Sequence, residues 1–165
     1  MKNVEATLKE FNSLKGYFLS DKKAMAYVRR NISSWDMDTL NGKMGVLGLR
    51  QLVPDYQYNY FLKSMADNDV KNAIMDGDFN IFKILVHDLS YLNCAKFITS
   101  TFLCAHAPDH FPIWDERKAL ISGWQKGKKS FCYVTLKRKI DVFKEENGLN
   151  SLDYFYFNKL LWYCE

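Results

Sequence analysis

The sequence predicts an all-α protein that folds as a single compact bundle of helices. Three observations favour this class: apolar residues recur at steps of three and four, alternating strand-like patterns are almost absent, and only three prolines occur in 165 residues. Apolar residues make up 48% of the chain and aromatic residues 16%, which is typical of a packed core. The length suits one domain, so we expect residues 1–165 to form a single helical domain.

Helices in the first half of the chain are predicted from their apolar stripes and from the residues that begin and end them. Leu8, Phe11 and Phe18 fall on one face of the first helix. Ser20 and Asp21 are N-cap candidates for the second. Turn residues such as Asn41-Gly42, Val53-Pro54 and Asp76-Gly77 separate the helices that follow. The ranges expected to be helical are 4–18, 21–28, 34–41, 44–52, 56–67 and 70–75.

The second half contains the most apolar predicted helix, residues 92–105, which we expect to be central and buried because its side chains are apolar nearly all round. Asp78 is expected to begin the helix before it. Pro108 and Pro112 predict a tight loop, exposed at one end of the bundle. The remaining helices are expected at 115–124, at 131–146 with Gly148 as a positive-φ stop, and at 152–164 with Ser151 as N-cap.

The sequence has no apolar run long enough to cross a membrane and no apolar leader behind its first lysine, so we expect a cytoplasmic protein without a membrane partner. Its four cysteines are scattered singly and are interpreted as reduced core residues. Neither the cysteines nor the three histidines have the spacing of a metal site, and we expect no metal and no cofactor. The oligomeric state is left open.

Basic residues are concentrated near the C-terminal end. The formal net charge is +4, and residues 116–146 hold nine basic residues against four acidic ones. Such a surplus can neutralise nucleic-acid phosphates, but basic helix faces are also common in solvent, so both interpretations remain. The candidate DNA contacts in this stretch are Lys126, Lys128, Lys129, Lys137 and Arg138.

One central segment points to a reaction. The stretch His110-Phe111-Pro112-Ile113-Trp114-Asp115 resembles the segment before the catalytic aspartate in adenine-type DNA glycosylases of the helix-hairpin-helix superfamily, and the resemblance extends over residues 89–115. It implies a fold like the glycosylase helical domain, DNA as partner, and Asp115 as the catalytic carboxylate. Lys96 lies nineteen residues earlier, where bifunctional members carry their Schiff-base lysine. Residues 149–163 are similar to the end of small bacterial relatives of that fold whose activity is unassigned.

Both residue types suit that chemistry. A lysine attacks the anomeric carbon of a damaged nucleotide as the neutral amine, which desolvation or a cationic neighbour favours. A carboxylate stabilises positive charge on the sugar as the base leaves, or activates the nucleophile.

The hairpin of the family corresponds to residues 89–94, which contain no glycine in place of the glycine-rich turn whose amides approach a phosphate. Asn93 is the candidate DNA contact in this turn. Each site residue also has a structural interpretation: Asp115 as a helix N-cap, Lys96 as a solvated surface lysine, and Trp114 as a core aromatic rather than a ring that stacks on an extruded base.

Three functions therefore stay open: a base-excision enzyme of the glycosylase or lyase type; a non-catalytic DNA-binding or protein-interaction module on the same scaffold; and a helical structural protein. The enzyme hypothesis expects Lys96 and Asp115 to face each other across a cleft, with Lys126, Lys128 and Lys129 on the same face. The capping hypothesis expects Asp115 to bond to following backbone amides and Lys96 to point into solvent.

Overall fold

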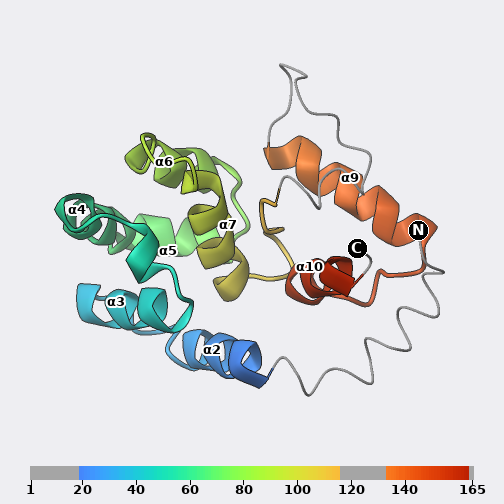
Figure 1. The fold of residues 1–165 in the computed structure, drawn as a ribbon, viewed down its shortest axis with the longest axis horizontal. Coiled ribbons are helices and arrows are strands. Elements are labelled where there is room, and N and C mark those ends of the chain that lie inside the picture. Colours follow the sequence, from blue (N-terminus) through green and yellow to red (C-terminus); the bar gives the residue numbers. More distant parts are fainter. Residues whose placement is uncertain (1–18, 116–132, 164–165) are drawn as a thin grey trace.

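The computed structural model describes residues 19–115 and 133–163, and within these ranges every regular element is a helix (Figure 1). The all-α prediction is confirmed. The elements are α2 (Leu19–Arg30), α3 (Met37–Val46), a short 3-10 helix (Arg50–Leu52), α4 (Asp55–Met65), α5 (Asn68–Met75), α6 (Asn80–Asp88), α7 (Ala95–His106), α9 (Tyr133–Glu146) and α10 (Tyr154–Tyr163). Predicted helices at 4–18 and 115–124 lie outside the described residues.

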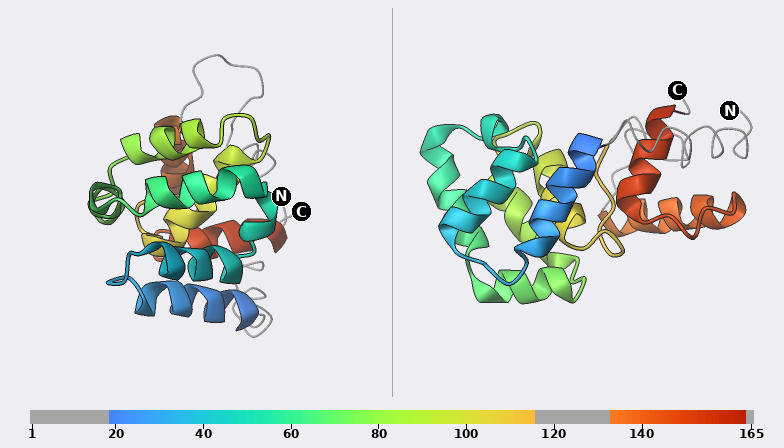
Figure 2. Two further views of the ribbon diagram at one scale, coloured as in Figure 1. Left: turned by 90° about the vertical axis from the view of Figure 1, so that its left-hand side faces the viewer. Right: turned by 90° about the horizontal axis from the view of Figure 1, so that it is seen from below.

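Helix α7 is the central element, as its all-round apolar sequence predicts. It packs against α2, α5, α6 and α10. Ile98 and Phe102 are fully buried and Ala105 nearly so, which places the predicted stripe in the core. Figure 2 shows α2 to α7 at one end of the molecule and α9 and α10 at the other, joined by the segment that follows α7.

That segment, residues 107–115, is mostly buried, so the expectation of an exposed loop between Pro108 and Pro112 is wrong. Within the loop only Asp109 and His110 are exposed, while Phe111 is fully buried. The Tyr154 amide donates to the Pro108 carbonyl at 3.0 Å, and the Tyr133 hydroxyl donates to the Pro112 carbonyl. The prolines do turn the chain, but the aromatic residues beside them are buried beneath the last two helices.

Two helix boundaries in the first half differ from the prediction. Asn41-Gly42 does not end a helix but lies inside α3, which begins after Asp36, whose carboxylate accepts from the Thr39 amide at 2.8 Å. The predicted helix 44–52 is divided, because Gly48 adopts a φ of +69° between α3 and the 3-10 helix. Tertiary contact explains the first difference: a Cβ on Gly42 would lie 2.7 Å from the Tyr27 hydroxyl, so this glycine admits α2 close to α3.

The caps of two other helices also differ. Ser20 and Asp21 lie within α2 rather than before it. Helix α10 is capped by Asp153, whose carboxylate accepts from the Tyr156 amide at 2.8 Å, and not by Ser151. The predicted stop after the long helix is confirmed, since Gly148 has a φ of +67°.

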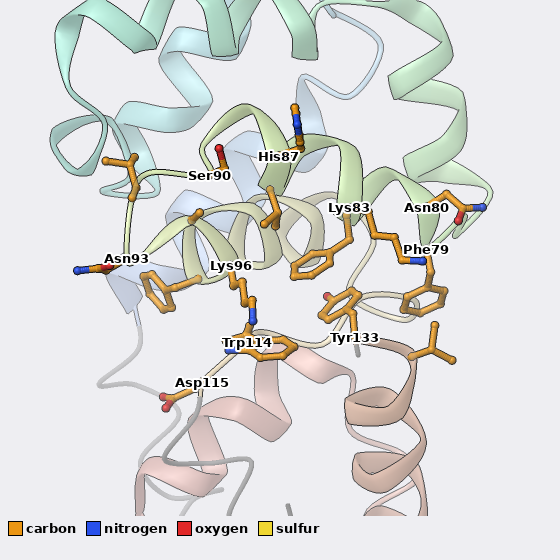
Figure 3. A pocket seen from close by; sticks show the side chains of 16 residues that line it. Phe79, Asn80, Lys83, His87, Ser90, Asn93, Lys96, Trp114, Asp115 and Tyr133 are labelled. Carbon is orange, nitrogen blue, oxygen red and sulfur yellow. The ribbon is translucent and has the colours of Figure 1, made fainter. Parts of the chain in front are cut away.

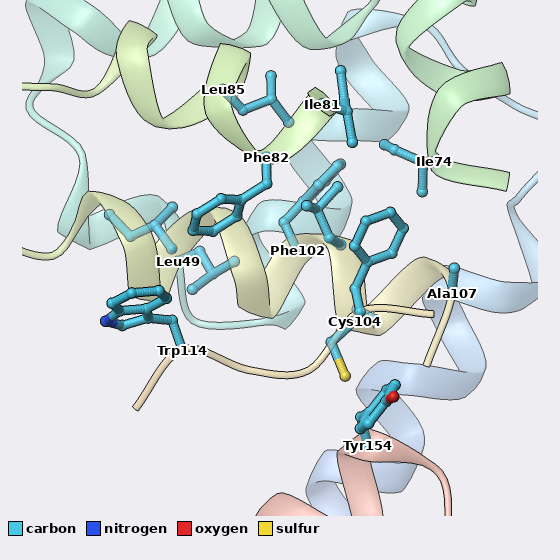
Figure 4. Close-up of a cluster of buried hydrophobic side chains, with 14 of the residues drawn as sticks. Leu49, Ile74, Ile81, Phe82, Leu85, Phe102, Cys104, Ala107, Trp114 and Tyr154 are labelled. Atoms are coloured by element: carbon cyan, nitrogen blue, oxygen red, sulfur yellow. The ribbon is translucent and has the colours of Figure 1, made fainter. Parts of the chain in front are cut away.

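The buried side chains form one hydrophobic cluster that runs through the described helices from α2 to α10. Figure 4 shows its middle, where Phe82 and Leu85 of α6 meet Phe102 of α7. Burying one such side chain contributes on the order of 1.5–3 kcal/mol, so this continuous core holds both ends of the molecule together. Cys104 is buried within it and Cys94 is half-buried, both as free thiols. In the described ranges, no helix has the length and apolarity to cross a membrane.

Candidate functional site

A groove of about 820 Å³ lies where α6, the 89–94 turn and α7 meet the segment before Asp115 and the start of α9 (Figure 3). Its apolar lining comes from Phe79, Phe82, Val86, Leu92, Ala95, Phe97, Trp114, Tyr133 and Val134. Its polar lining comes from Asn80, Lys83, His87, Ser90, Asn93, Lys96 and Asp115. A pocket of this size with an apolar lining and a few polar groups is typical of a small-molecule or cofactor site.

The floor of the groove is a set of nearly parallel aromatic rings. The Phe82 and Tyr133 rings stack with centroids 3.8 Å apart at 11°, and the Trp114 ring lies 6.1 Å from Phe82 at 19°. Two hydrogen bonds hold these residues in place. The Trp114 amide donates to the Ser100 hydroxyl at 2.7 Å, and the Tyr133 hydroxyl donates to the Pro112 carbonyl. Burial raises the pKa of Tyr133 well above its ordinary value, so the phenol stays protonated and keeps donating.

Lys96 lies in the first turn of α7, and its side chain crosses the face of Trp114. Its ammonium nitrogen is 4.4 Å from the centroid of that ring. Such a cation–π contact contributes about 0.5–1 kcal/mol at an exposed site. Lys96 is exposed, as the surface-lysine interpretation expects, but it lines the groove rather than extending into open solvent.

Asp115 is half-buried and lines the same groove, directly after Trp114. In the view of Figure 3, Lys96 lies above the Trp114 ring and Asp115 below it. The structure thus brings to one groove the two residues that the glycosylase resemblance singles out. Whether Asp115 also caps a helix depends on Arg117 and Lys118, which lie outside the described residues.

The predicted DNA contacts divide into three groups. Lys126, Lys128 and Lys129 lie outside the described residues. Asn93 is exposed and lines the groove.

Lys137 and Arg138, the third group, do not line the groove. The Lys137 ammonium lies 2.6 Å from the Asp141 carboxylate and 5.5 Å from the Tyr154 ring centroid, so this side chain packs toward α10. Arg138 is exposed one helical turn beyond the groove residue Val134.

The 89–94 turn closes without the backbone that the family's glycines permit. In the described ranges every residue with positive φ is a glycine, and this turn has none. Instead, the Leu92 amide donates to the Leu89 carbonyl at 2.8 Å, and Leu89 is fully buried. Side chains of Ser90 and Asn93, rather than a row of backbone amides, therefore face the groove from this turn.

Sequence reasoning missed the groove residues of α6. Asn80, Lys83 and His87 recur at steps of three and four on the helix face that lines the groove. The spacing is visible in the sequence, but only the packing of α6 on α7 shows that this polar face borders a cavity rather than open solvent.

Within the described ranges, no group of three or more histidine, cysteine, aspartate or glutamate side chains is arranged to hold a metal ion. Comparisons of the chain with family models, with curated proteins and with solved structures find no match.

Proposed function

We propose that this protein binds DNA and holds an unpaired base in the groove between α6 and α7. The observation that carries the proposal is the stacked aromatic floor with the Lys96 ammonium over Trp114. An unpaired base offers a flat π-face to aromatic side chains, and its phosphate offers a charge to a lysine. Both features occur here within one groove.

When a nucleotide binds, one contact within the protein is replaced by two contacts with the nucleotide. In the free protein the Lys96 ammonium covers the Trp114 ring. An incoming base takes that place over the ring, and Phe97, which is 40% exposed and lines the same groove, offers a further aromatic face for stacking. The displaced ammonium then pairs with a phosphate of the same nucleotide, so the lost cation–π contact is replaced by base stacking and a charge-assisted hydrogen bond.

The charge of the groove agrees with an anionic ligand. Lys83 on α6 and Lys96 on α7 both line it, and among the described lining residues the one carboxylate is that of Asp115. The whole chain carries a formal net charge of +4. These positive charges attract a phosphodiester and release counterions when it binds.

Fluorescence anisotropy with labelled oligodeoxynucleotides tests the proposal, using a single strand and a duplex that contains an abasic site. We expect binding of at least one of them, with an affinity that falls steeply as salt rises. Phe97→Ala should weaken binding about tenfold, because stacking contributes roughly 1–3 kcal/mol per base. The matched control is Ile84→Ala, an exposed apolar residue of α6, 55% accessible, that does not line the groove. Absence of binding at low salt, or equal loss in both variants, contradicts the proposal.

A second candidate function, base excision, is favoured by one further observation: Lys96 and Asp115 line the same groove. As the N-glycosidic bond breaks, its electron pair leaves with the base and positive charge develops on the sugar, which the Asp115 carboxylate stabilises. Water then adds to the anomeric carbon and loses its proton to the carboxylate. Alternatively the Lys96 amine adds there, after it has left Trp114 and lost its proton.

Borohydride trapping on abasic DNA tests this second candidate. We expect a covalent adduct between abasic DNA and the wild-type protein and none with Lys96→Gln. On DNA that still carries its bases, the wild-type protein should release a base, while Asp115→Asn should bind but release none. A wild-type protein that binds DNA and yields neither adduct nor released base is a binding module, and base excision is then wrong.

A further inference from the structure

One rim of the groove is a continuous row of polar side chains. Asn80, Lys83 and His87 on α6 are followed by Ser90 and Asn93 in the turn, and all five are exposed and line the groove. Each of these side chains can donate a hydrogen bond, and none is a carboxylate. Figure 3 shows them spread along the groove above the aromatic floor.

The row is longer than a site for a single phosphate group. At a rise of about 1.5 Å per residue, the α6 part of the row from Asn80 to His87 extends for roughly 10 Å, and Ser90 and Asn93 extend it further. One phosphate group fills only part of that length. A polyanion that lies along the groove can therefore accept hydrogen bonds along its whole length.

The part of the groove around Trp114 differs in charge from this row. It contains the Lys96 ammonium, which lies over the Trp114 ring, and the Asp115 carboxylate, which repels phosphate. A carboxylate accepts hydrogen bonds from the amino groups of bases instead. The row from Asn80 to Asn93 therefore favours phosphates, whereas the part around Trp114 favours base edges at Asp115 and one phosphate at Lys96.

From this asymmetry we propose that the groove binds single-stranded DNA lengthwise, with successive phosphates along the row from Asn80 to Asn93 and the bases turned toward Trp114 and Asp115. This inference rests on the proposed function and deepens it. A duplex keeps its bases stacked inside, so it presents phosphates to the rim but no base faces to the floor. Lys83 is the charged residue of the row and neutralises one phosphate.

The salt dependence of binding tests this arrangement. For wild-type protein and a labelled single strand, log K is measured against log salt; Lys83→Gln should lower the magnitude of the slope by about 0.7, the contribution of one phosphate contact to a single strand, and weaken binding several-fold. Lys63→Gln, which removes an exposed lysine of α4 outside the groove, should leave slope and affinity unchanged. Asn80→Ala should weaken binding without changing the slope. A duplex of the same sequence should bind at least tenfold more weakly than the strand.

Failure of this inference is distinguishable from failure of the proposed function. If wild-type protein binds neither a single strand nor an abasic duplex, the proposed function fails and the inference with it. If it binds DNA but Lys83→Gln and Lys63→Gln behave alike, or the duplex binds as tightly as the strand, then phosphates do not lie along the row from Asn80 to Asn93. The proposal that the protein binds DNA would still hold. Lys83 is exposed, so circular dichroism of the variant should match that of the wild type.

Discussion

At the scale of single residues, the structure contains a buried histidine that is held neutral. His106 is 3% exposed at the end of α7, and its Nδ1 lies 2.8 Å from the Phe102 carbonyl oxygen. Because a carbonyl only accepts, Nδ1 carries the proton, and Nε2 is a buried acceptor with no hydrogen-bond partner among the described residues. Burial lowers the pKa of His106 to about 3, with the nearby Lys43 acting in the same direction.

This histidine should make stability fall with mild acid. The unfolded chain takes up a proton near pH 6.5 and the folded chain only near pH 3, so folding loses stability as pH falls below 6.5. From pH 7.5 to pH 5 we expect the free energy of unfolding to drop by about 2 kcal/mol from this residue alone. Urea denaturation at a series of pH values measures it. His106→Asn, which keeps a donor for Phe102, should remove that share of the pH dependence, and an unchanged pH profile in the variant contradicts the assignment.

Sequence reasoning identified part of the site at this scale. Lys96, Asp115 and Asn93 were predicted as site residues and do line one groove. Lys43 shows what the sequence does not reveal: its side chain is fully buried, its ammonium lies 4.6 Å from the Trp35 ring centroid, and burial lowers its pKa to about 8. A lysine is buried when other helices pack around it. The sequence near a single lysine in an amphipathic stretch does not show whether this packing occurs.

At the scale of elements, the existence of the helices follows from the apolar period, but their ends depend on tertiary contacts. Ser151 and Asp153 are both good capping residues by type. Asp153 is the one that caps α10, and it also lies 3.7 Å from Arg29 of α2, so a contact with a distant helix favours this choice. Local sequence does not contain that contact.

The cap of α10 can be tested by paired substitutions. Asp153→Ala should lower the free energy of unfolding by about 1 kcal/mol, because the Tyr156 amide loses its acceptor. Asp153→Asn keeps a capping oxygen and should cost less, which separates the cap from the partly exposed ion pair with Arg29. Ser151→Ala is the control and should change little. If Ser151→Ala lowers the thermal unfolding temperature more than Asp153→Ala does, then Ser151 is the N-cap residue of α10 and Asp153 is not.

At the scale of the whole molecule, the groove forms only where several segments of the chain pack together. Its lining comes from α6, the turn and first residues of α7, the segment before Asp115, and the start of α9, which the chain brings together from residue 79 to residue 134. The apolar period predicts each helix but not which polar faces meet around a cavity. The buried course of residues 107–115 beneath α9 and α10 has the same origin, since it depends on Tyr133 and Tyr154 bonding to carbonyls far back in the chain.

The most direct test of the central claim, that the groove holds an unpaired nucleotide, is chemical-shift mapping by NMR of the full chain titrated with a short single-stranded oligodeoxynucleotide. We expect saturable shifts at the Trp114 indole, the Phe97 ring, the Lys96 side chain and the amides of α6 that border the groove, with α2 and α3 unaffected. Shifts concentrated on α2 and α3, or no shifts at concentrations well above those of the anisotropy titration, would contradict it.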